Sequence, residues 1–125
     1  MKTYTQLIFE TSSPWQNPYQ GTDKKVLFVC SAGILRSATA ARIYAKKYNT
    51  RAAGSAQYAL ISVSNDLLAW ANEIVFVNEE NYQAVAEHWD LKSFDKPIKV
   101  LDIPDQYPHM HPELIEAFKQ QYEEI

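Results

Sequence analysis

The sequence predicts an α/β protein, a single-domain three-layer α/β/α fold with a four-stranded parallel sheet. Short apolar segments alternate with segments of helical pattern along the chain, and this alternation is typical of parallel sheets. The chain has 125 residues, of which 46% are hydrophobic, enough for the core of one domain. We divide it into an N-terminal extension, residues 1–24, and a domain, residues 25–125.

The extension is predicted from its composition. Residues 3–10 suit a short strand or an arm, and residues 12–23 suit a surface loop because they contain two prolines, Asn17 and Gly21. Two interpretations stay open for Trp15 and Tyr19. They either pin the extension onto the domain or wall the entrance of a site.

The domain begins with residues 26–29, an apolar segment rich in β-branched and aromatic residues. This composition predicts a strand buried on both faces. Alanines and other apolar residues then recur with helical spacing, which predicts a helix over residues 37–48. The remaining predicted elements are a strand at 51–53, a helix at 65–71, a strand at 73–77, a helix at 80–88, a strand at 98–101 and a helix at 112–122.

A cysteine lies at the point where the first strand ends. Cys30 follows the strand directly, and Arg36 and Ser37 begin the helix six and seven residues later. A loop that enters a helix N-terminus directs backbone N–H groups into one small concavity, where the helix dipole adds positive potential. The sequence therefore predicts a phosphate-binding loop, lined by Ser31, Ala32, Gly33, Ile34 and Leu35.

This loop has the components of a nucleophilic site. The N–H donors and the guanidinium of Arg36 favour the thiolate of Cys30, and the planar fork of Arg36 suits two oxygens of a phosphoryl group. Ser37 is placed to hydrogen-bond the sulfur as it leaves. The alternative is a buried structural cysteine with Arg36 merely starting the helix. An arginine in the first helical turn is unfavourable unless an anion is present, which favours the first interpretation.

The chain resembles the low-molecular-weight protein tyrosine phosphatases, and within them a short bacterial and phage-type branch of predicted tyrosine phosphatases. The resemblance covers residues 24 to about 122, and its anchors are residues 26–31, 35–37, 52–54, 68–77, 101–107, 110 and 112–115. It implies that Cys30 is the nucleophile, Arg36 the phosphate clamp, Ser37 the thiolate stabiliser and Asp105 the general acid.

By this resemblance the substrate is a phosphotyrosine protein or a small aryl phosphate, hydrolysed through a phosphocysteine intermediate without cofactor or metal. The chain also differs from the family. It has Ala32 and Gly33 where the larger enzymes have Gly-Asn, an asparagine that braces the loop. Leu35 stands where many members have a second cysteine.

Two carboxylates follow the last predicted strand. Asp102 and Asp105 both lie near the carboxyl edge of the predicted sheet, where the Cys30 loop also emerges. We favour Asp105 as the acid and expect Asp102 to cap the following turn. Tyr107, which follows Asp105, is the best-placed candidate to stack on a substrate ring, ahead of Tyr58 and Trp70, and we expect Trp70 to lie in the core.

Composition argues against several other classes of protein. A net charge of -3 without a dense Lys/Arg cluster argues against nucleic-acid binding, and no apolar run reaches membrane-spanning length. One cysteine excludes an internal disulfide, and no signal peptide is visible, so we expect a cytoplasmic protein. His109 and His111 alone make a weak set of metal ligands.

Two other functions stay open. A glutaredoxin-coupled arsenate reductase shares the expected fold and thiol loop, whereas versions with an internal thiol relay need more cysteines than this chain has. A non-catalytic phosphate- or phosphopeptide-binding module would bind phosphate without turnover. The sequence does not predict the oligomeric state.

Overall fold

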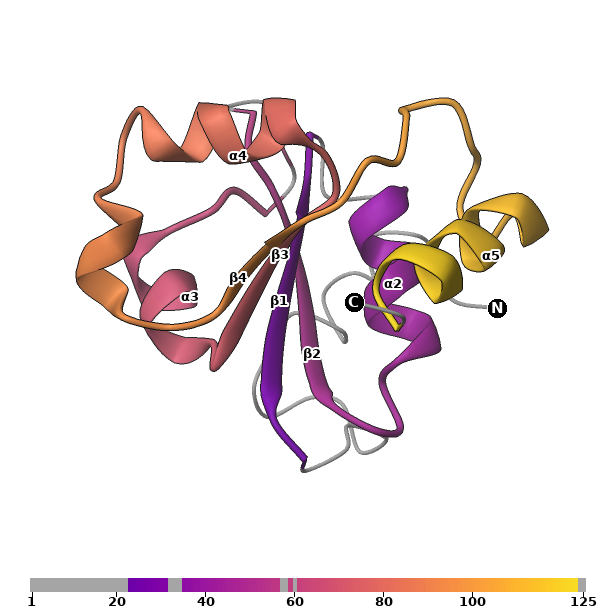
Figure 1. Cartoon of the computed structure of the whole chain (residues 1–125), viewed down its shortest axis with the longest axis horizontal. Helices are drawn as coiled ribbons and strands as arrows, with labels where there is room; N and C mark the ends of the chain where they lie inside the picture. Colours follow the sequence, from indigo (N-terminus) through magenta and orange to yellow (C-terminus); the bar gives the residue numbers. More distant parts are fainter. Residues whose placement is uncertain (1–22, 32–34, 57–58, 60, 124–125) are drawn as a thin grey trace.

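The computed structural model describes residues 23–31, 35–56, 59 and 61–123. Four parallel strands form one sheet in the order β2-β1-β3-β4, and helices cover both of its faces (Figure 1). This confirms the predicted fold class. The predictions for the N-terminal extension, including Trp15 and Tyr19, lie outside the described residues.

The strands are β1 (Lys25–Cys30), β2 (Asn49–Gly54), β3 (Glu73–Phe76) and β4 (Ile98–Val100). β1 lies in the middle, paired with β2 on one side and β3 on the other. All its residues after Lys25 are buried, as expected for a strand covered on both faces. Because the strands are parallel, their carboxyl ends meet at one edge of the sheet, toward the top of Figure 1.

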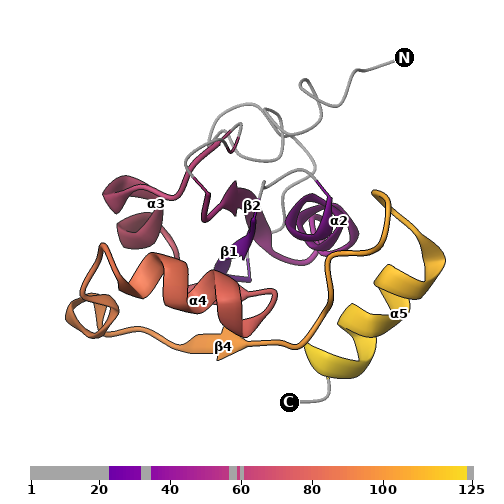
Figure 2. The same ribbon diagram turned by 90° about the horizontal axis from the view of Figure 1, so that it is seen from above.

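The helices form two outer layers. α2 (Arg36–Ile43) and α5 (Pro112–Gln121) cover one face, and α3 (Asn65–Trp70) and α4 (Glu79–Ala86) cover the other (Figure 2). β1 contributes to both cores, with Phe28 on the α2 and α5 side and Val29 on the opposite side. No helix in the described part of the chain is both long enough and apolar enough to cross a membrane.

The prediction for the first helix was wrong at its end. α2 stops at Ile43 instead of residue 48, and β2 begins at Asn49 instead of residue 51. The hydroxyl of Thr50 donates to the carbonyl of Ala41 at 2.7 Å, so a side chain from β2 satisfies a carbonyl in the last turn of α2. The chain must reverse within five residues to bring β2 alongside β1.

The other predicted elements are present, with ends that differ by one or two residues, within the usual range of assignment. A short 3-10 helix, η1 (Leu91–Phe94), was not predicted. Its backbone turns the chain from α4 toward β4, and its first residue, Leu91, is buried in the core on the α3 and α4 side.

A buried carboxylate joins elements that are far apart in the sequence. Glu73, at the start of β3, accepts a hydrogen bond from the hydroxyl of Tyr122 at 2.7 Å. The ammonium groups of Lys24 and Lys99 lie 3.1 Å and 3.5 Å from the same carboxylate. Burial alone would raise the pKa of Glu73, but the hydrogen bonds from Tyr122 and Lys24 and the charges of Lys24 and Lys99 hold it below its ordinary value.

We expect Glu73→Gln to lower the free energy of unfolding near neutral pH by roughly 1.5–3 kcal/mol, the range for hydrogen bonds to charged groups. The folded-state pKa of Glu73 is lowered, so its stabilisation is present above the unfolded-state pKa and is lost as the pH falls through the folded-state pKa. Urea unfolding at neutral and at acid pH measures this difference.

The matched control is Glu116→Gln, on the exposed side of α5, which should change stability little at either pH. A loss for Glu73→Gln that is the same at neutral and acid pH would show that its charge does not stabilise the fold.

Candidate active site

The candidate nucleophile lies at the carboxyl end of the central strand. Cys30 is the last residue of β1 and is only 2% exposed. Its Sγ lies 3.0 Å from Oγ of Ser37, in the first turn of α2. Oγ of Ser37 also lies 3.5 Å from the carbonyl oxygen of Ala53, a longer and weaker contact. The fold thus places the hydroxyl of Ser37 directly against the sulfur of Cys30.

Arg36 carries a charge in a buried position, with an exposed fraction of 1%. Its Nη1 donates to the carbonyl of Ile103 at 2.9 Å, and its Nη2 donates to Oγ of Ser31 at 3.3 Å. Its buried Nε makes no hydrogen bond and lies 3.6 Å from Oδ1 of Asp105. The guanidinium therefore joins the loop after β1 to the segment after β4, and these hydrogen bonds use two of its five N–H groups.

The start of α2 adds to this positive potential. Leu35 occupies the N-cap position without a side-chain hydrogen bond, and the first turn contains no acidic residue. The first N–H groups of a helix have no partner within the helix, and its dipole is positive at that end. Neither a capping side chain nor an acidic residue of the first turn compensates this end of α2.

The two candidate acids have different surroundings. Asp105 faces Arg36 and is largely exposed, with 62% of its side-chain surface accessible. Asp102 is exposed, and its backbone N–H and carbonyl are both bonded to the side chain of Gln121 at 2.6 Å and 2.9 Å. Of the two, the structure brings Asp105 to the guanidinium beside the cysteine loop.

A contact to α2 fixes the far end of the segment that carries Asp105. The backbone N–H of Met110 donates to Oγ1 of Thr39 at 2.8 Å, and that hydroxyl donates to the carbonyl of Leu35 at 2.7 Å. Nδ1 of His109 lies 3.4 Å from the same hydroxyl, and burial is the main cause that lowers the pKa of His109. Thr39 thus connects this segment to the residue just before α2.

The candidate aromatic residues lie in different places. Tyr107 is half-buried, and its ring centre lies 5.6 Å from that of His111. Trp70 is half-buried and packs against the core on the α3 side without belonging to its buried residues, and the guanidinium of Arg51 lies 3.9 Å from its ring centre. Tyr58 and the loop residues Ala32, Gly33 and Ile34 lie outside the described residues.

Sequence reasoning missed two asparagines at the start of α4. Asn78 caps this helix by accepting from the N–H of Asn81 at 3.1 Å. Nδ2 of Asn81 donates to Oγ of Ser31 at 3.1 Å and to Oγ of Ser55 at 3.2 Å. The only signal for them in the sequence was their position at the start of a helix that follows a strand. In a parallel sheet such a helix begins at the carboxyl edge of the sheet.

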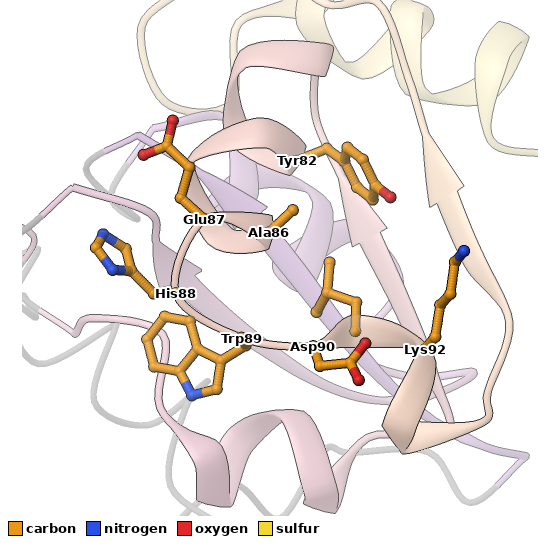
Figure 3. Close-up of a pocket in the computed structure, with 8 residues that line it drawn as sticks. Tyr82, Ala86, Glu87, His88, Trp89, Asp90 and Lys92 are labelled. Carbon is orange, nitrogen blue, oxygen red and sulfur yellow. The ribbon is translucent and has the colours of Figure 1, made fainter.

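A hollow lies away from Cys30. It has a volume of about 510 Å³ and is found between the end of α4 and η1. Figure 3 shows the rings of His88 and Trp89 on one side of it and Tyr82 on the other. None of the described candidate site residues lines this hollow.

The described residues contain no group of three or more His, Cys, Asp or Glu side chains placed to hold a metal ion. A scan against protein-family models found no matching family, and searches of curated proteins and of solved structures found no match.

Proposed function

We propose that the protein is a cysteine-dependent phosphatase, similar to the low-molecular-weight protein tyrosine phosphatases, that hydrolyses phosphotyrosine or related aryl phosphomonoesters. One observation carries the proposal: Cys30 Sγ lies 3.0 Å from a hydroxyl of α2, while the adjacent, buried Arg36 faces Asp105. A thiol, a phosphate clamp and a proton donor are the groups that this reaction needs.

The reaction has two steps. The thiolate of Cys30 attacks phosphorus, so the Sγ–P bond forms while the bond from phosphorus to the aryl oxygen breaks, and Asp105 gives its proton to that oxygen. Water then attacks the phosphocysteine, the Sγ–P bond breaks, and Asp105 takes the proton of the water. Ser37 donates its hydrogen bond to the departing thiolate, and inorganic phosphate leaves.

The guanidinium of Arg36 supplies the electrostatic part of catalysis. Its bonds to Ile103 and Ser31 fix the plane of the fork before the substrate arrives. Two of its five N–H groups are used in these bonds and the Nε–H faces Asp105, so the remaining Nη hydrogens are the donors for a phosphoryl oxygen. A donor that is already oriented stabilises charge in the transition state without reorganisation at the moment of reaction.

We expect Asp105→Asn to lower the rate of phosphotyrosine hydrolysis by about 10²–10⁴-fold, because the poor leaving group then lacks its proton donor. The loss should be smaller for p-nitrophenyl phosphate, whose leaving group is stable as an anion. Steady-state kcat and kcat/KM for the two substrates measure the difference.

Asp102→Asn is the matched control, because Asp102 lies in the same segment but its backbone is bound to Gln121. This variant should keep both activities. An equal loss on both substrates for Asp105→Asn, or the selective loss appearing in Asp102→Asn, would assign the acid role to another group.

A further inference from the structure

The hydroxyl oxygen of Ser31 accepts two hydrogen bonds, one from Arg36 and one from Asn81. Nη2 of Arg36 lies 3.3 Å from its Oγ, and Nδ2 of Asn81 lies 3.1 Å from it. A serine hydroxyl has two acceptor lone pairs and one hydrogen. With both lone pairs occupied, its hydrogen must point away from Arg36 and Asn81.

The position of Ser31 is fixed independently of its side chain. Its carbonyl accepts from the N–H of Ala56 at 3.0 Å, which holds the residue to the chain that leaves β2. Ser31 comes directly after Cys30, and its side chain is only partly buried. Because its hydroxyl oxygen accepts from Arg36 and Asn81, the hydroxyl hydrogen is left for donation to a third group.

Asn81 is held in a single orientation by a second contact. Its Nδ2 also donates to Oγ of Ser55, at 3.2 Å, so both of its hydrogens are used. The residue is only 1% exposed, and its Oδ1 has no hydrogen-bond partner. A buried polar atom left without a partner is rare in folded proteins and requires an explanation. Here the amide orients two serine hydroxyls and leaves its own oxygen unpaired.

We propose that Asn81 is a positioning residue that acts together with Arg36 to turn the hydroxyl of Ser31 into a hydrogen-bond donor for the oxyanion bound beside Cys30. This inference rests on the proposed function, because it assumes that the Cys30 loop binds a phosphoryl group or inorganic phosphate. By this inference, α4 contributes a residue to the site in addition to covering one face of the sheet. Asn81 itself does not touch the anion.

The test is a double-mutant cycle with inorganic phosphate as the probe. The dissociation constant of phosphate is measured by calorimetry for the wild type, Asn81→Ala, Ser31→Ala and the double variant. We expect each single change to weaken phosphate binding by about tenfold, the effect of one hydrogen bond to a charged group. The double variant should be no weaker than Ser31→Ala alone, because Asn81 acts through Ser31.

Two further variants separate positioning from general support of the fold. Gln83→Ala, on the exposed side of α4, should bind phosphate as the wild type does. Asn81→Asp keeps the size of the side chain but presents acceptors to Ser31, which reverses the direction of its hydrogen bond. This variant should bind phosphate more weakly than Asn81→Ala, and it provides the test if the alanine variant fails to fold.

Losses that multiply in the double variant, or wild-type phosphate binding by Asn81→Asp, would overturn the inference. So would the absence of phosphate binding in the wild type. A wild type that binds phosphate without hydrolysing p-nitrophenyl phosphate would contradict the proposed phosphatase, while the phosphate affinities of the cycle would still decide the role of Asn81.

Discussion

Replacing Cys30 by Ser is expected to reduce turnover of p-nitrophenyl phosphate and of a phosphotyrosine peptide by at least about a thousandfold. The hydroxyl is nearly isosteric with the thiol and keeps the contact to Ser37, but it does not ionise near neutral pH. The variant should therefore fold and bind phosphate while it fails to form the covalent intermediate.

Release of inorganic phosphate, followed beside the circular dichroism spectrum and the phosphate dissociation constant, separates loss of chemistry from loss of fold. A Cys30→Ser protein that turns over at the wild-type rate would exclude the thiol as nucleophile.

The second large effect is expected for Arg36→Lys, which keeps the positive charge and removes the planar fork. A single ammonium group cannot replace the donors that reach Ile103, Ser31 and an incoming phosphoryl group together. We expect kcat/KM to fall by about 10²–10³-fold, the usual cost of removing one oriented donor from a developing anion. The affinity for inorganic phosphate should fall in parallel.

Arg42→Lys provides the matched control, because Arg42 lies on the same helix with an exposed side chain. Its kinetics and phosphate affinity should equal those of the wild type. Wild-type kcat/KM in Arg36→Lys would show that charge alone is sufficient and that the orientation of the guanidinium has no catalytic role.

Much of the fold was predictable because local patterns agreed with the final structure. The apolar run of β1 and the alternation of strands and helices are sufficient to predict a parallel sheet. The end of α2 was not predictable, because the residues after Ile43 continue a helical composition. The bond from Thr50 to Ala41 at the end of α2 forms only when β2 lies beside α2, so local sequence does not reveal it.

The candidate site also has a part that the sequence predicts and a part that it does not. Cys30 and Ser37 are close in the sequence, and the strand–loop–helix unit that contains them brings the sulfur and the hydroxyl within 3.0 Å of each other. The placement of Asp105 followed from the rule that parallel strands end at one edge.

The role proposed for Asn81 had no such signal. An asparagine in the first turn of a helix is ordinary, and only the approach of Ser31 and Ser55, the residues that directly follow β1 and β2, gives it specific partners. Hydrogen bonds between residues about 50 positions apart along the chain, such as that from Asn81 to Ser31, depend on the assembled sheet. Local spacing does not encode them.

The most direct test of the account is to trap the covalent intermediate. Wild-type protein is mixed with p-nitrophenyl phosphate without added metal and quenched within milliseconds, and the peptide that contains Cys30 is examined by mass spectrometry. We predict one phosphoryl group on Cys30 in the wild type and none at this position in Cys30→Ser. Turnover without a phosphorylated Cys30, or a phosphoryl group attached to another residue, would contradict the proposed mechanism.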